Sequence, residues 1–172
     1  EVGKLIVKAA GASNLKKVTL ELGGKSPNII LPDADISAAI AGAANAIFFN
    51  HGQCCCAGSR LFVHRSQFSQ VIEGVAAHAK GIKVGHGLHP ETGMGPLVSK
   101  IQQDRVCGFL DSGKREGAKA VVGGKRGEGE GYFVEPTVLI DTKPDMQVIR
   151  EEIFGPVAAA VEYDEPEELV QA

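Results

Sequence analysis

Short runs with the composition of strands alternate along this chain with longer stretches whose apolar residues recur at helical spacing. Strand-like runs cover residues 17–22, 26–32, 60–64, 118–122, 132–140 and 157–163, with an interruption at Pro136. Helical spacing appears at residues 1–10, 36–47, 68–80 and 99–113, in a short turn at 146–151, and again from 165 to 172. This alternation favours an α/β fold with a mostly parallel sheet and flanking helices.

Polar residues that commonly cap helices precede three of these helical stretches. Asp33 or Asp35 precedes the alanine-rich stretch, Ser66 precedes the next, and Ser99 precedes the third. Their side-chain oxygens can accept a hydrogen bond from a free N–H in the first helical turn. The sequence therefore predicts helix starts at these positions.

The run at residues 17–22 alternates in polarity, as a half-buried strand does. Val18, Leu20 and Leu22 share one face, and Glu21 lies on the other. We expect Glu21 on a strand, with its carboxylate pointing away from the core.

Composition excludes several classes of protein. The 172 residues are 44% hydrophobic and 23% charged, which suits one domain with a core of its own. The net charge is −3 and no cluster of lysine or arginine exceeds two residues, so no nucleic-acid partner is expected. The longest nearly apolar run, residues 36–49, is shorter than the roughly 20 residues of a membrane span, and the first residues lack a signal-peptide pattern. We expect a cytoplasmic protein.

Four cysteines are present, and their spacing does not suit a disulfide framework. Cys54, Cys55 and Cys56 are contiguous, and Cys107 lies about fifty residues later. Neighbouring cysteines bridge only with strain, so we expect free thiols in a reducing compartment. The run lacks the C-x-x-C spacing of a zinc site, and no metal is expected. Cys54, Cys56 and Cys107 are predicted to pack rather than to react.

Two glycine-rich segments do not satisfy phosphate-loop patterns. The segment Gly23–Ser26 ends in Gly-Lys-Ser, but the position five residues before Gly24 is Thr19 instead of glycine. Residues 123–131 are followed by no helical pattern, so this segment is expected to be a flexible turn. Gly23 and Gly24 either allow a close backbone approach or form a plain turn.

The three contiguous cysteines fall between a helical stretch and a strand-like run, in the segment Ile47–Arg60. Junctions of this kind often present reactive side chains. We expect a cysteine nucleophile from this segment and the Glu21 carboxylate to share one active site.

Three separated segments carry a resemblance to a known family. They are residues 20–27, Leu-Glu-Leu-Gly-Gly-Lys-Ser-Pro; residues 49–60, Phe-Asn-His-Gly-Gln-Cys-Cys-Cys-Ala-Gly-Ser-Arg; and residues 151–156, Glu-Glu-Ile-Phe-Gly-Pro. In order and at suitable separations, they resemble the NAD(P)-dependent aldehyde dehydrogenase superfamily, with residues 95–98 and 131–137 in register between them.

The resemblance implies a role for five residues. Cys55 is expected to be the nucleophile and Glu21 the general base. Glu152 is expected to bind the nicotinamide-side ribose, Phe154 to pack near the nicotinamide, and Gly3 to close the dinucleotide-binding motif.

The resemblance also implies an organisation and a reaction. Residues 1–22 would be a remnant of a cofactor-binding domain, with its last helix and a linking strand, and residues 23–172 a catalytic domain truncated at its C-terminal end. The reaction would oxidise an aldehyde to a carboxylic acid with NAD or NADP in a homo-oligomeric parent enzyme, and the isolated chain would be inactive. Asn50 and His51 look most similar to enzymes acting on aromatic aldehydes such as phenylacetaldehyde.

Other interpretations of the same residues remain open. Glu21 could be an exposed strand glutamate, Glu151 and Glu152 a solvated acidic pair, and His51 a partner of Cys55 as in cysteine hydrolases. The protein would then be a cofactor-independent cysteine esterase or acyl hydrolase, or a non-catalytic binding or structural module of the same fold.

Overall fold

The computed structural model describes residues 1–171, with side chains through residue 170; Ala172 lies outside the described residues. The helices are α1 (Val2–Gly11), α2 (Ile36–Phe48), α3 (Phe68–Gly81), α4 (Lys100–Glu116), α5 (Gln147–Arg150) and α6 (Pro166–Gln171). Two short 3-10 helices are η1 (Phe49–Gly52) and η2 (Arg65–Gln67). The strands are β1 (Pro27–Ile30), β2 (Arg60–His64), β3 (Lys119–Val122), β4 (Thr137–Ile140) and β5 (Val157–Tyr163).

The strands form one five-stranded sheet in the order β1-β2-β5-β4-β3. β1, β2, β5 and β4 run parallel, and β3 pairs antiparallel with β4 at one edge. The predicted α/β fold with a mostly parallel sheet is therefore confirmed.

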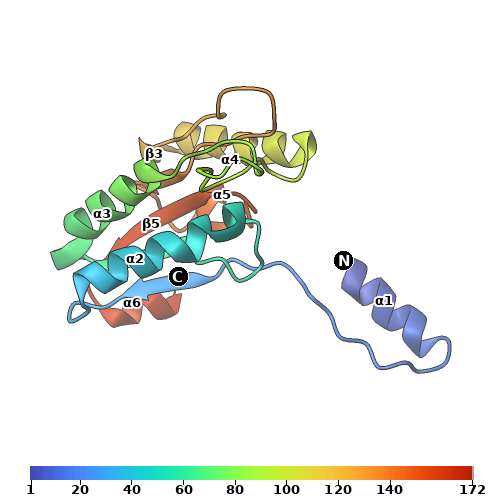
Figure 1. Ribbon diagram of the computed structural model, residues 1–172. Coiled ribbons are helices and arrows are strands. Elements are labelled where there is room, and N and C mark those ends of the chain that lie inside the picture. Colours follow the sequence, from blue (N-terminus) through green and yellow to red (C-terminus); the bar gives the residue numbers. More distant parts are fainter. Residues whose placement is uncertain (172) are drawn as a thin grey trace.

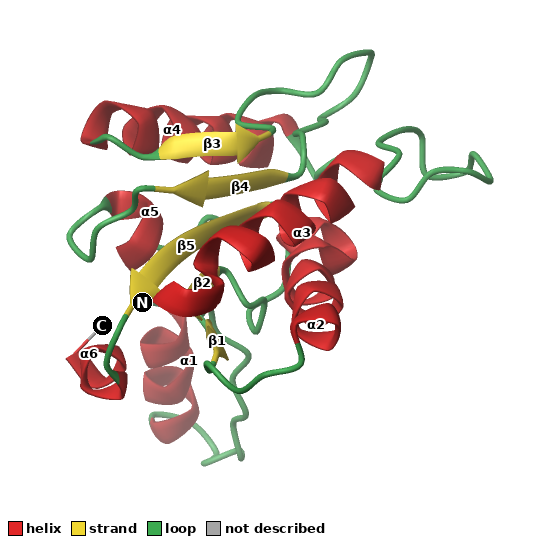
Figure 2. Cartoon of the chain, turned by 90° about the vertical axis from the view of Figure 1, so that its left-hand side faces the viewer, coloured by secondary structure: helices red, strands yellow, loops and turns green. Residues whose placement is uncertain are grey.

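Helices cover both faces of the sheet. α2 and α3 pack with one set of buried strand residues, including Val138 and Ala158, and α4 and α5 pack with the alternate set, including Leu139 and Ala159. Figure 2 shows α3 in front of the sheet and α4 behind it. Because successive strand residues point to opposite faces, the central strand β5 is buried on both sides.

α1 stands apart from the sheet, at the end of a long extended segment (Figure 1). The predicted strand at residues 17–22 is wrong, because none of these residues belongs to a strand in the described part of the chain. A strand needs a backbone partner, and the sheet begins at β1. Leu20 and Leu22 nevertheless share a face, as predicted, since both lie against Gly3 of α1.

The helix starts are predicted correctly at two of three positions. Asp35 accepts a hydrogen bond from the Ala38 N–H, and Ser99 accepts one from the Gln102 N–H. The prediction for Ser66 is wrong: its N–H donates to the His64 ring, the chain forms η2, and α3 begins only at Phe68.

The strand predicted over residues 132–140 is confirmed only in its second half, β4. Pro136 has no N–H to donate to a sheet, and the residues before it turn toward residues 125–127 instead.

No helix in the described residues is long and apolar enough to cross a membrane.

Candidate active site

Three segments meet where neighbouring parallel strands begin. Residues 21–24 precede β1, residues 53–56 precede β2, and residues 152–154 precede β5. Since β1, β2 and β5 are parallel neighbours, their amino ends lie at the same edge of the sheet. The topology therefore brings together side chains that lie up to about 130 residues apart in sequence.

A cavity of about 550 Å³ lies among these segments. It is lined by Glu21, Leu22, Gly23, Gln53, Cys54, Cys55, Gln102, Arg105, Glu152 and Phe154. This volume is within the usual range of small-molecule sites. Four of the five predicted site residues thus share one cavity.

The fifth predicted residue, Gly3, does not line this cavity. It is buried near the start of α1, where a side chain would press on Leu20 and Leu22. Leu22 lines both the main cavity and a neighbouring one beside Gly3. Gly3 is therefore connected to the site through the extended segment, without direct contact.

The chain reaches the cysteines through a left-handed turn after α2. Asn50, His51 and Gly52 all have positive φ, at 48°, 62° and 65°. The Asn50 side chain donates to the Gln53 carbonyl oxygen at 3.0 Å. Left-handed conformations cost about 1–2 kcal/mol for residues other than glycine, so this turn is held in place by its surroundings.

The His51 ring contacts the backbone of a neighbouring loop and not Cys55. Its Nε2 accepts a hydrogen bond from the Gly95 N–H at 3.1 Å, and it lines a different cavity, beside residues 92–96. The structure does not bring His51 into the cavity that contains Cys55.

Gly52 is expected to tolerate no side chain. Its φ is +65°, and an added Cβ would lie well under 3.0 Å from the Gly155 carbonyl oxygen. Because this neighbour is backbone, it cannot rotate away. Gly52→Ala is expected to lower the free energy of unfolding by about 3–5 kcal/mol, measured by urea titration followed by circular dichroism.

Gly42 provides the matched control for this substitution. It lies in the interior of α2, and an added Cβ would meet nothing within 4 Å. Gly42→Ala should raise the free energy of unfolding by about 0.5–1 kcal/mol, since alanine favours the helix. Equal stability of the two variants would contradict the proposed overlap at Gly52.

Gly23 and Gly24 allow the predicted close backbone approach. A Cβ on Gly23 would overlap the Glu152 carboxylate, and one on Gly24 would overlap the Cys55 carbonyl oxygen. The Gly24 N–H also donates to Glu152 Oε1 at 3.1 Å. The two glycines therefore let three segments come into contact at the cavity.

α4 holds the segment that carries Glu152 and Phe154. Gln102 Nε2 donates to the carbonyl oxygens of Ile153 and Phe154, at 3.0 and 2.8 Å, and Arg105 Nη2 donates to that of Glu152 at 3.0 Å. Phe154 has a φ of +58°, which these bonds help to maintain. The sequence analysis did not predict a role for Gln102 or Arg105. In the sequence, only their polar side chains and their spacing of one helical turn could have indicated that both face the same segment.

Glu21 reaches the cavity from the extended segment and not from a strand. The residue is exposed, so its carboxylate is open to water. Its backbone is flanked by Leu20 and Leu22, which lie against Gly3. The expectation that a sheet would fix Glu21 is wrong, and contact with α1 takes the place of strand pairing.

Lys25 is a buried amine beneath the site. Its Nζ has no hydrogen-bond partner among the described residues. Burial, with the nearby charge of Arg60, lowers the pKa of Lys25 to about 8, although the charge of Glu152 acts in the opposite direction. The Arg60 guanidinium itself donates to the Lys25 carbonyl oxygen at 2.9 Å.

The lowered pKa gives stability a defined pH dependence. The unfolded chain keeps the Lys25 proton up to about 10.5, whereas the folded chain releases it near 8, so the unfolded state binds more protons between these values. Stability is therefore expected to rise from pH 8 to 10.5, by on the order of 3 kcal/mol at most.

Lys25→Met should remove this dependence. Below pH 8 the folded wild-type chain carries a poorly solvated charge, so the variant should be more stable at pH 7 by about 1–3 kcal/mol in urea titration. The exposed Lys80→Met should change stability by less than about 0.5 kcal/mol. A less stable Lys25→Met variant would mean that the amine is paired in solution.

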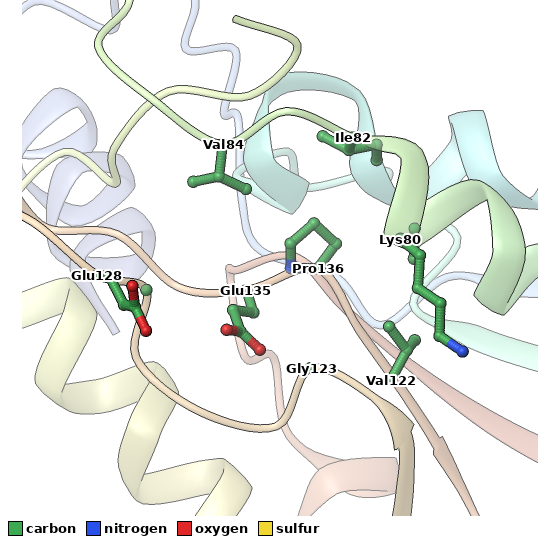
Figure 3. Close-up of a pocket in the computed structure, with 10 residues that line it drawn as sticks. Lys80, Ile82, Val84, Val122, Gly123, Glu128, Glu135 and Pro136 are labelled. Carbon is green, nitrogen blue, oxygen red and sulfur yellow. The ribbon is translucent and has the colours of Figure 1, made fainter.

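A second cavity, of about 380 Å³, is lined by fewer kinds of side chain that could act in catalysis (Figure 3). It lies between the end of α3 and the glycine-rich loop, and its lining includes Lys80, Glu128 and Glu135. Glu135 is paired with Lys125 at 3.3 Å, and Lys80 points away from both glutamates in Figure 3. Because its lining contains no cysteine, serine, threonine or histidine, we place the candidate site at the Cys55 cavity.

Comparisons with known proteins identify the family to which this chain is similar. The sequence model of the Aldehyde dehydrogenase family matches residues 1–172. A putative aldehyde dehydrogenase, DhaS, of Bacillus subtilis is 50% identical over 99% of this chain and 34% of its own length. Human mitochondrial aldehyde dehydrogenase is 48% identical over 99% of this chain and 33% of its own length.

A solved structure shows the same similarity in three dimensions. The NAD+ complex of an aldehyde dehydrogenase from Bacillus cereus superposes with a TM-score of 0.93 at 50% identity, covering 99% of this chain and 34% of that one. The chain thus spans about a third of the length of the relatives it matches. The family model extends over the whole chain, and these sequence and structural similarities agree with it, so the chain belongs to the aldehyde dehydrogenase family.

Proposed function

We propose that the protein oxidises aldehydes to carboxylic acids with NAD or NADP, and that this chain supplies the nucleophile Cys55 and the general base Glu21. One observation carries the proposal: both residues line one cavity together with Glu152 and Phe154. A thiol can attack the carbonyl carbon, a carboxylate open to water can activate the hydrolytic water, and both lie in one cavity.

The cavity residues fit a dinucleotide cofactor. The Glu152 carboxylate can accept hydrogen bonds from ribose hydroxyls while the Gly24 N–H holds one of its oxygens. Phe154 offers an aromatic ring at the same cavity, and its backbone carbonyl oxygen accepts a hydrogen bond from Gln102. Gly3, near the N-terminus of α1, is proposed as a further cofactor contact. The bound nicotinamide would supply the acceptor for the hydride that the substrate carbon loses.

The chain's own residues account for the other steps. The Cys55 thiolate attacks the carbonyl carbon, and the Cys55 backbone N–H is the proposed donor to the oxygen that becomes negative. After hydride loss, the acyl group stays on Cys55 as a thioester. Glu21 takes a proton from water, the resulting nucleophile attacks the thioester, and Cys55 leaves as the thiolate.

The same pair could hydrolyse an ester without a cofactor, so the experiment must separate the two reactions. We would assay the full-length protein for NADH or NADPH formation with aliphatic and aromatic aldehydes, and for ester hydrolysis without cofactor. Cofactor reduction that requires an aldehyde is expected. Ester hydrolysis without any cofactor reduction would contradict the proposal and favour the acyl hydrolase, and the absence of both would favour a non-catalytic module.

Three further features belong to the same proposal. Residues 1–22 would belong to a cofactor-binding domain and residues 23–172 to the catalytic domain. The full-length protein would be a homo-oligomer, with aromatic aldehydes among its substrates. Residues 1–172 alone are expected to reduce no NAD, since they span about a third of the relatives' length.

A further inference from the structure

Cys54 and Cys56 lie on either side of Cys55 in sequence but contact each other in space. Their Sγ atoms are 3.4 Å apart. The turn explains this contact: the Ala57 N–H donates to the Cys54 carbonyl oxygen at 3.1 Å, which folds residues 54–57 back on themselves. The prediction that Cys56 packs is wrong, because Cys56 is exposed, whereas Cys54 is half-buried at the cavity.

The two thiols differ in acidity. A hydrogen bond from the Cys56 backbone N–H lowers the pKa of Cys54, and side-chain hydrogen bonds with Cys56 and, to a smaller extent, with Cys55 act in the same direction. The pKa of Cys56 is raised, chiefly by its side-chain hydrogen bond with Cys54. The contact therefore favours the thiolate form of Cys54 and the protonated form of Cys56.

The pair can supply two sulfur ligands, so a suitable bound atom has two coordination positions to fill. Within residues 1–171 no group of three or more His, Cys, Asp or Glu side chains could hold a metal ion. A structural zinc ion, which takes four ligands, does not suit such a site. A trivalent arsenic atom that carries one carbon substituent has two positions left to fill, and two adjacent thiols can fill both.

We propose that Cys54 and Cys56 form a two-thiol site that captures monosubstituted trivalent arsenicals, with Cys55 taking no part. In the reaction, the two S–H bonds and the two As–O bonds of an arsonous acid, R–As(OH)₂, break. Two As–S bonds form, the protons and hydroxyls leave as two waters, and arsenic stays trivalent. Since Cys54 lines the cavity, the bound group would lie at the opening toward Cys55.

The test uses the 172-residue chain, phenylarsine oxide as the probe and intact mass as the readout. The reduced protein is treated with one equivalent of the probe and then challenged with excess glutathione, a monothiol. Wild type, Cys55→Ser and Cys107→Ser are expected to retain one phenylarsenic group. Cys54→Ser and Cys56→Ser should need about 10²- to 10⁴-fold less glutathione to lose it, because the second bond forms within the same molecule.

A denatured sample shows whether the fold selects the pair. In guanidinium chloride the three consecutive cysteines become equivalent, so Cys54→Ser should retain arsenic through the remaining two. Circular dichroism confirms that each variant is folded in the native arm. The proposal is overturned if Cys55→Ser loses the group as readily as Cys54→Ser does, or if native and denatured chains give the same pattern.

Discussion

Cys55→Ala is expected to lower the rate of NAD-dependent aldehyde oxidation by the full-length protein about 10⁴-fold or more. Removing the nucleophile of a covalent mechanism has cost as much as about 10⁶-fold in a well-studied hydrolase. Absorbance of NADH under saturating aldehyde measures the effect.

Cys107→Ala is the matched control for this substitution. Cys107 lies in α4 against the core cluster on that side of the sheet, and burial raises the pKa of its thiol. Its removal should leave turnover within about twofold, with a stability loss of about 1 kcal/mol. Substantial oxidation by Cys55→Ala, or an equal loss in Cys107→Ala, would remove Cys55 from the proposed role.

The central strands could be predicted from the sequence with their observed bounds. β2 and β5 occupy residues 60–64 and 157–163, as their apolar runs indicate. Both lie inside the sheet and are buried on both faces, so local composition and tertiary environment agree. The segment at residues 17–22 has an equally clear alternation but no strand partner in this structure, and alternation alone cannot reveal whether a partner exists.

Part of the site also follows from sequence and topology. Glu21, Cys55 and Glu152 each stand a few residues before a strand, and those three strands prove to be parallel neighbours. Gln102 and Arg105 could not be found in this way. Their function depends on where α4 packs against residues 152–154, which is a long-range contact that no local pattern encodes.

Glu21→Gln is expected to lower steady-state turnover about 10²- to 10⁴-fold, the usual contribution of a general base. Glutamine keeps the size and exposure of the side chain but cannot take a proton from water. If Glu21 acts only on the thioester, the variant should still form that thioester once. Stopped-flow measurement should therefore show a burst of about one NADH per site, followed by a slow phase.

Glu151→Gln provides a matched control, because Glu151 is exposed near the same site and accepts a hydrogen bond from Gln147 one turn away in sequence. This change should leave both the burst and the slow phase within about twofold of wild type. Glu21 lies on an extended segment outside the sheet and is exposed, so its carboxylate is open to water. Loss of the burst together with turnover in Glu21→Gln would contradict a role limited to hydrolysis and would mean that Glu21 also acts on Cys55.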